Sequence, residues 1–214
     1  MNVENYIDKT QNSSENIKTL DQLLEKLKTP EELSEYMRKN IEYGFVGKEN
    51  NKVYSSSDID FDVDFEKEYF LQPPEQLLNS KNGLCWDQVE LERQWFLKQK
   101  FDFKTYFLMF VKEESNNLPT HTFLTYKNKD KFYWFENSFE ANKGIHEYEN
   151  FDALIEDVKK KQFDYARNEC DATDNDFKDL KYCEYEMPRF GASTDEFITN
   201  IIDHNSKREV MRNK

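Results

Sequence analysis

Apolar residues in the first part of the chain recur at helical spacing. Between residues 17 and 27 they fall three or four positions apart, which predicts an amphipathic helix. A second helix is predicted from residue 30, because Thr29 and Glu32 form a capping box and Pro30 suits the first helical position. Its apolar stripe ends at Ile41, and Gly44 is expected to stop it. Both helices are interpreted as packing elements.

Further along, helical spacing gives way to apolar runs that predict strands. The runs FKTYFLMFVK (103–112), THTFLTY (120–126) and KFYWFEN (131–137) are rich in aromatic and β-branched residues, and the polar KNKD between the last two predicts a hairpin. Helices are predicted over 85–100 and 151–163, a strand over 180–187, and a final helix after the capping box of Ser193 and Glu196. The two prolines of LQPPEQLLNSKNG are expected to form an extended turn.

The stretch DIDFDVDFE (58–66) alternates acidic and apolar residues. A calcium loop would need a glycine at position 63 and a glutamate at position 69, where the chain has Val63 and Tyr69. An amphipathic strand with a solvated acidic face is therefore preferred.

Composition narrows the class of protein. The 214 residues carry a net charge of −13 but include 18 Phe, 12 Tyr and 3 Trp, enough large rings for a core. The acidity argues against nucleic-acid binding. With no visible signal peptide or membrane span and only three cysteines, the sequence predicts a cytoplasmic protein without a disulfide framework. Cys170 and Cys183 are interpreted as structural, and a zinc site that joins them to His204 matches no standard spacing.

The stretch NGLCWDQ (82–88) contains the residue most suggestive of chemistry. Cys85 follows Gly83 and opens a predicted helix. A buried structural cysteine is the simpler interpretation. In the alternative, the helix dipole would favour a Cys85 thiolate, free backbone N–H groups would hold an oxyanion, and the sulfur would face a groove.

A nucleophilic cysteine needs a base, and His121 is preferred to His146 and His204 because it leads a strand of the predicted hairpin. A turn centred on Asn128 and Lys129 would place Glu136 directly opposite His121, so that the carboxylate orients the imidazole. Asn137 would then point to the opposite face of the sheet.

These three blocks together resemble the transglutaminase-like cysteine superfamily. PPEQLLNSKNGLCWDQVELERQ, HTFLTY and FYWFENSF are similar to its Gly-x-Cys helix start, its histidine strand and its acid-bearing strand, and GIHEY is typical of a little-described bacterial branch. The resemblance implies an α+β fold with a papain-like core, in which the cysteine helix packs on an antiparallel sheet. It implies Cys85 as nucleophile, His121 as base and Glu136 as third member. The chain has Glu where the commonest pattern has Asp, and His-Thr-Phe where His-Ala-Trp is frequent.

The sequence thus predicts one domain, with an N-terminal helical part (1–68), a transglutaminase-like core (69–150) and a C-terminal buttress (151–214). The expected activity is acyl transfer or hydrolysis at an amide of a protein or peptide, without metal or organic cofactor. Trp86 is either a site wall or a core aromatic, and Gln72 is read as a surface residue in preference to an oxyanion donor. Two alternatives stay open: a binding module with an unused triad, and a papain-type peptidase with Asn137 as orienter.

Overall fold

A computed structural model describes residues 17–49, 51–56, 65, 67–111 and 118–202. Its centre is a five-stranded antiparallel sheet with strand order β6-β5-β4-β3-β7. The strands are β3 (Asp102–Phe110), β4 (His121–Asn128), β5 (Lys131–Glu136), β6 (Gly144–Tyr148) and β7 (Leu180–Glu184). The fold is therefore α+β, with neighbouring strands antiparallel throughout this sheet.

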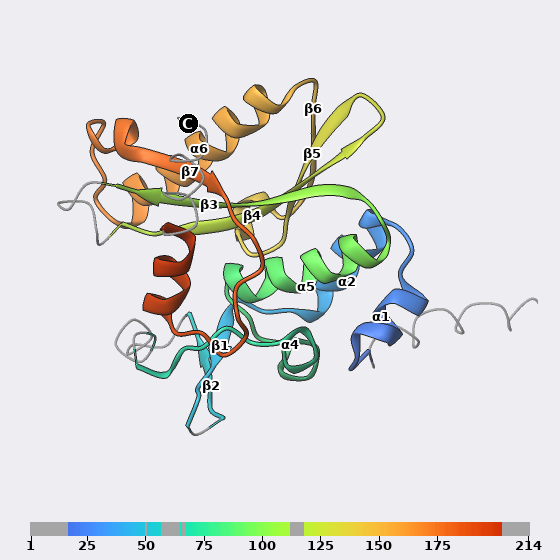
Figure 1. The fold of residues 1–214 in the computed structure, drawn as a ribbon. Coiled ribbons are helices and arrows are strands. Elements are labelled where there is room, and N and C mark those ends of the chain that lie inside the picture. Colours follow the sequence, from blue (N-terminus) through green and yellow to red (C-terminus); the bar gives the residue numbers. More distant parts are fainter. Residues whose placement is uncertain (1–16, 50, 57–64, 66, 112–117, 203–214) are drawn as a thin grey trace, which may run out of the picture.

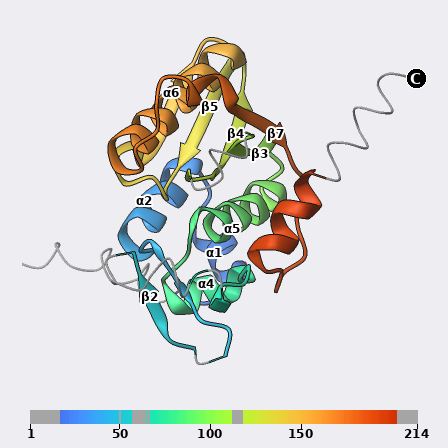
Figure 2. The ribbon, with the colours of Figure 1, turned by 90° about the vertical axis from the view of Figure 1, so that its left-hand side faces the viewer.

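Helices cover both faces of the sheet (Figure 1). Helix α5 (Cys85–Lys98) packs on one face, backed by α1 (Leu20–Lys26), α2 (Pro30–Asn40) and α4 (Pro74–Ser80). Helix α6 (Phe151–Glu169) packs on the other. The turned view of Figure 2 shows the same order, with α6 and α5 on opposite sides of the strands.

The alternation of side chains along the strands explains this three-layer arrangement. On β4, Phe123 joins the cluster that packs on α6, whereas Leu124 joins the cluster that packs on α5. On β5, Trp134 and Phe135 divide in the same way. A strand buried on both faces reads as a continuous apolar run, as these two do.

A third cluster surrounds the start of α5. It joins the small hairpin of β1 (Gly44–Val46) and β2 (Val53–Ser55) to the helix that runs through residues 194–202. In Figure 1 this last helix, in red, lies beside the first turn of α5. Trp86 of α5 stacks on Phe197 with ring centroids 4.0 Å apart. Residues far apart in the sequence therefore support the first turn of α5.

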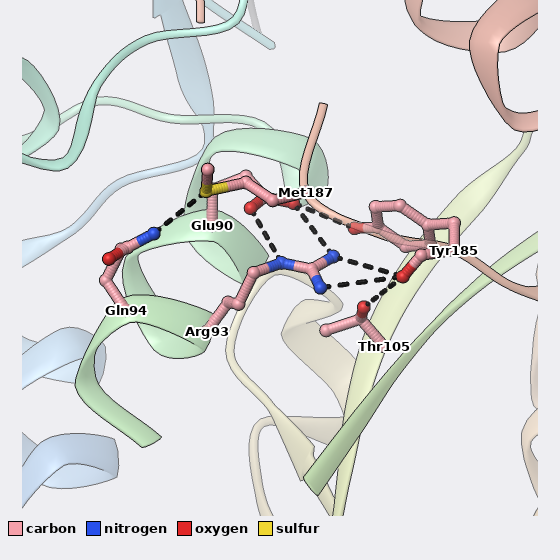
Figure 3. A network of polar contacts seen from close by, with 6 residues as sticks. All are labelled: Glu90, Arg93, Gln94, Thr105, Tyr185 and Met187. Carbon is pink, nitrogen blue, oxygen red and sulfur yellow. Dashed lines mark hydrogen bonds and ion pairs between the residues drawn. The ribbon is translucent and has the colours of Figure 1, made fainter. Parts of the chain in front are cut away.

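A polar network ties the segment after β7 to the middle of α5 (Figure 3). Arg93 donates to Glu90 over 2.8 Å, and the Tyr185 hydroxyl donates to the same carboxylate over 3.3 Å. The Tyr185 carbonyl accepts from Thr105 over 2.9 Å and from Arg93 over 3.5 Å. The buried Glu90 and Arg93 charges are thus paired with each other and fix the course of the C-terminal segment.

Several predicted elements differ from the structure. The capping box of Thr29 and Glu32 is present, but α2 ends at Asn40, and Gly44 begins β1. Pro73 and Pro74 start helix α4 instead of a turn, because proline fits the first position of a helix. Helix α6 extends to Glu169. The acidic stretch 58–66, except Phe65, lies outside the described residues.

Candidate active site

Cys85 is the first residue of α5. The preceding Leu84 is extended, and its N–H donates to Asp87 over 2.9 Å, so the third helical residue caps the helix start. Asp87 also accepts from the Gln72 N–H over 2.8 Å and from the Tyr69 hydroxyl over 3.2 Å. Burial raises the pKa of Asp87 to about 7 even though these hydrogen bonds oppose the shift. Asp87 therefore anchors the backbone that presents Cys85.

Gln88 and Asn137 form a second anchor of the same loop. Gln88 donates to the Gly83 carbonyl over 2.8 Å and accepts from Asn137 over 2.7 Å. Asn137 follows the last residue of β5, so this chain of contacts joins the end of the sheet to the cysteine loop. Asn137 therefore contacts Gln88, on the α5 side, and the His121 ring is bonded to a different residue.

That residue is Glu136. His121 begins β4, Glu136 ends β5, and their Nε2 and Oε2 atoms are 2.8 Å apart. Both side chains are buried. The predicted register was wrong: the ladder runs from Leu124–Phe135 to Asn128–Lys131, which moves the turn to Lys129 and Asp130.

The pairing is displaced by two residues from the predicted one, so Glu136 stays on the same face of the sheet as His121. Continuation of the observed ladder puts Glu136 opposite Phe123, so it is the diagonal neighbour of His121 and not its direct partner. Side chains two positions apart on one strand share a face, and diagonal neighbours are within reach of long side chains. A glutamate has the length to cover this diagonal.

The Glu136 carboxylate is held by four donors. Oε2 faces His121, and Oε1 accepts from the backbone N–H groups of Ser138 and Phe139, each over 2.8 Å, and from the Ser138 hydroxyl over 3.0 Å. Burial would raise the pKa of Glu136, but the His121 charge and these hydrogen bonds outweigh burial and lower it. The carboxylate is thus charged and fixed in place.

His121 is held in its charged form by the same contact. Burial would lower the pKa of His121, but the Glu136 charge and hydrogen bonds with Cys85 and Glu136 raise it to about 10. Because Nε2 faces Glu136, Nδ1 is the ring nitrogen left for the Cys85 sulfur. Phe123 and Phe139 flank the imidazole ring at centroid distances of 6.2 and 5.9 Å. The structure therefore brings Cys85, His121 and Glu136 together, with His121 between the other two side chains.

Tyr43 lies close to this group. It precedes β1, and its hydroxyl interacts with the Cys85 side chain in buried surroundings, although the residue as a whole is 37% exposed. Cys85 itself is only 5% exposed, so its sulfur does not face an open groove as the sequence predicted. Sequence reasoning missed Tyr43, because IEYGF was read as the end of a helix.

Trp86 and Gln72 have packing roles in the structure. Trp86 is 3% exposed among the rings of Tyr69, Phe107 and Phe197. Gln72 is buried and not at the surface as predicted. Its amide donates to the Asn82 carbonyl over 3.0 Å and accepts from the Ser80 hydroxyl over 3.2 Å, so it braces the loop before Cys85.

A buried acid on α5 was also missed. Glu92 is 1% exposed and lies two turns after Cys85 on the same helix. Its Oε2 atom has no hydrogen-bond partner in the structure. Burial raises the pKa of Glu92 well above its ordinary value, and the nearby Glu136 charge adds to the effect. No sequence motif marks this residue.

The other candidate ligands and bases lie elsewhere. His146 is on β6, where its Nε2 contacts the Asn142 carbonyl over 2.7 Å. Cys170 follows the last residue of α6, and Cys183 is on β7. His204 lies outside the described residues. Within the part of the chain that is described, no group of three or more His, Cys, Asp or Glu side chains is placed to hold a metal ion.

Neither a search for membrane-spanning helices nor comparison with known proteins assigns a function to the chain. None of the helices in the described ranges is both long and apolar enough to cross a membrane. Comparison with protein-family models and with curated protein sequences found no match to this chain.

Proposed function

We propose that the protein is a thiol-dependent acyltransferase or hydrolase that acts on an amide of a protein or peptide. The observation that carries the proposal is that His121 lies between Cys85 and Glu136. The Cys85 thiol is at the start of α5, and the buried His121 and Glu136 side chains are 2.8 Å apart. The resemblance to transglutaminase-like cysteine enzymes supports the same assignment, with a papain-like core built from α5 and the antiparallel sheet.

The proposed reaction has two half-reactions. The Cys85 thiolate attacks the amide carbonyl, and the His121 imidazolium gives its Nδ1 proton to the leaving amine, which leaves a thioester on the enzyme. Water or a second amine then attacks the thioester, with neutral His121 taking the proton of the attacking group. The C–S bond breaks, which releases the acid or the new amide and restores the Cys85 thiolate. Glu136 keeps the imidazole oriented and stabilises its charged form.

The first test compares the three cysteines. Iodoacetamide at pH 6 should modify Cys85 faster than Cys170 and Cys183, although Cys85 is the most buried of the three, because the charged His121 pairs with the thiolate. Peptide mass spectrometry after timed quenching gives the three rates. His121→Ala should remove the preference for Cys85. Slower modification of Cys85 than of the other two would contradict the proposal.

The second test detects the acyl-enzyme. Mixing with p-nitrophenyl acetate should release a burst of nitrophenol and add one acetyl group to Cys85, seen by intact mass. Cys85→Ala should abolish both signals, whereas Cys170→Ala and Cys183→Ala should retain them.

A second function is favoured by one observation, the 5% exposure of Cys85. A closed site suits a binding module that keeps the three side chains without using them. Slow alkylation together with no acetylation would support this alternative.

A further inference from the structure

The segment before β1 brings a phenol to the nucleophile. We propose that the Tyr43 hydroxyl and the backbone N–H of Cys85 form the oxyanion hole of this site. The inference rests on the proposed acyl chemistry and adds a catalytic residue to it. Tyr43 lies outside the three sequence blocks on which the resemblance is based.

The backbone fixes Tyr43 next to the cysteine loop. The Glu42 N–H donates to the Lys81 carbonyl over 2.8 Å, and the Glu42 carbonyl accepts from the Gly83 N–H over 3.1 Å. Residues 42 and 82 thereby form a parallel bridge. The residue after this bridge is Tyr43, so its position relative to Cys85 is set by the same loop that starts α5.

Gly44 allows this close approach. A Cβ atom at position 44 would lie 2.5 Å from the Tyr54 carbonyl oxygen and 3.3 Å from the Asn82 side chain. Since Tyr54 belongs to β2 and Asn82 to the cysteine loop, any larger residue would force the three segments apart. The glycine therefore lets β1 carry Tyr43 against the site.

Two other side-chain donors near the loop are already engaged. The Gln72 amide donates to the Asn82 carbonyl, and the Gln88 amide donates to the Gly83 carbonyl. By contrast, the Tyr43 hydroxyl lies close enough to the Cys85 side chain to interact with it. The oxygen that gains charge is bonded to the carbon that the sulfur attacks, so a donor beside the sulfur is placed near that oxygen.

The second donor comes from the helix start. The first N–H groups of an α-helix have no partner within the helix. In α5 the first such bond is donated by Gln88 to the Leu84 carbonyl. The Cys85 N–H therefore has no partner within α5 and, like the other N–H groups of a first helical turn, points toward the helix N-terminus, where it can donate to an oxyanion.

The step balances as follows. As the Cys85 sulfur bonds to the carbonyl carbon, the electron pair of the C=O π bond moves to oxygen. The Tyr43 O–H and the Cys85 N–H donate hydrogen bonds to this oxyanion. When the C=O bond re-forms, the C–N bond breaks and the amine leaves with the proton from His121. Tyr43 keeps its proton throughout. Burial, followed by the Cys85 charge, raises the pKa of Tyr43 well above its ordinary value, which is consistent with a donor that stays protonated.

The experiment separates two reactions of one thiol. Acetylation by p-nitrophenyl acetate passes through an oxyanion, whereas alkylation by iodoacetamide is a displacement at carbon that forms none. In Tyr43→Phe the acetylation rate constant should fall about 10²-fold or more, the loss typical for one oxyanion donor. The alkylation rate constant should change less than about tenfold. Tyr165→Phe removes a nearby hydroxyl on α6 and is the matched control, expected to leave both rates within about threefold.

Every other result contradicts the inference. An equal fall in acetylation and alkylation would make Tyr43 a residue that positions the thiol, and unchanged acetylation would exclude it as a donor. Unfolding curves of Tyr43→Phe and the unsubstituted protein should coincide, so that a rate change is not a folding defect. If the unsubstituted protein alkylates at Cys85 but is never acetylated, the proposed function itself fails, and this outcome is seen before any variant is made.

Discussion

Glu136 controls the charge of His121, since its carboxylate outweighs the effect of burial on the imidazole. In the unsubstituted protein the His121 ring signals should titrate with a pKa near 10. Glu136→Gln removes the charge but keeps a hydrogen-bond acceptor, so the pKa should fall from this value, because the Cys85 contact is then the main effect that opposes burial. NMR titration of the histidine ring protons measures both values.

The matched control is Asn137→Ala, which removes a neighbouring polar side chain bonded to Gln88. It should leave the His121 pKa near 10. A large fall in Asn137→Ala and none in Glu136→Gln would instead make Asn137 the orienter of the histidine. The raised pKa also means that His121 stabilises the fold fully below pH 6.5 and that this stability is lost as the pH rises toward 10.

Substitution of Glu92 should stabilise the fold at high pH, whereas substitution of Glu90, which is paired with Arg93 on the same helix, should destabilise it. The pKa of Glu92 is higher in the folded than in the unfolded protein, so its contribution is greatest below the unfolded value of 4.5 and is lost as the pH rises. Glu92→Gln should therefore increase the free energy of unfolding at pH 8 and flatten its dependence on pH. Urea unfolding at pH 5 and pH 8 tests this.

Glu90→Gln is the comparison, because Glu90 forms a 2.8 Å ion pair with the buried Arg93. Loss of one partner leaves an uncompensated buried charge and should cost about 3–5 kcal/mol. A lower stability of Glu92→Gln at pH 8 would mean that the fold stabilises the Glu92 carboxylate, which would contradict the raised pKa.

At the scale of elements, the aromatic contact between α5 and the last helix supports the first turn of α5. Phe197 is fully buried and stacks on Trp86 at 4.0 Å. Phe197→Ala should reduce the free energy of unfolding by about 3–5 kcal/mol. Ile202→Ala, on the same helix but 44% exposed, should change it by less than about 0.5 kcal/mol. Urea denaturation followed by Trp fluorescence gives both, and similar effects of the two changes would contradict this role.

The longer elements could be predicted from the sequence, and the short ones could not. The β4–β5 hairpin and α5 are marked by apolar runs and spacing that many residues share. Hairpin β1–β2 has three residues in each strand, too few for a periodic pattern. The prolines before α4 are compatible with both a turn and a helix start, and only packing of Leu77 and Leu78 in the core decides.

The candidate site was predictable only in part, for a similar reason. A turn misplaced by one residue shifts the pairing of the two strands by two residues. Such a shift leaves His121 and Glu136 on the same face of the sheet, so the prediction still brought them together. Tyr43, Glu92 and the buried position of Gln72 depend on contacts between distant segments. Alternation along one element carries no information about such contacts.

At the scale of the whole molecule, charge repulsion should matter. A net charge of −13 on a chain of this size disfavours the compact state, and salt screens such repulsion over distances beyond about 8 Å at 0.15 M. The urea midpoint should therefore rise between 0.02 and about 0.3 M NaCl. A falling midpoint would mean that surface ion pairs such as Lys39–Glu35 and Lys104–Glu184 outweigh the net charge.

The network between α5 and the segment after β7 also sets an order of events during synthesis. Glu90 and Tyr185 are 95 positions apart, so a nascent chain already contains Cys85, His121 and Glu136 when Tyr185 has yet to be made. At roughly 5–20 residues per second, translation from Glu136 to Phe197 takes about 3–12 s. During this interval α5 lacks Tyr185 and the Phe197 ring on Trp86. The ribosome-bound chain would therefore carry its thiol on a helix whose first turn lacks its aromatic support, and a competent site would form only once the last helix packs on Trp86.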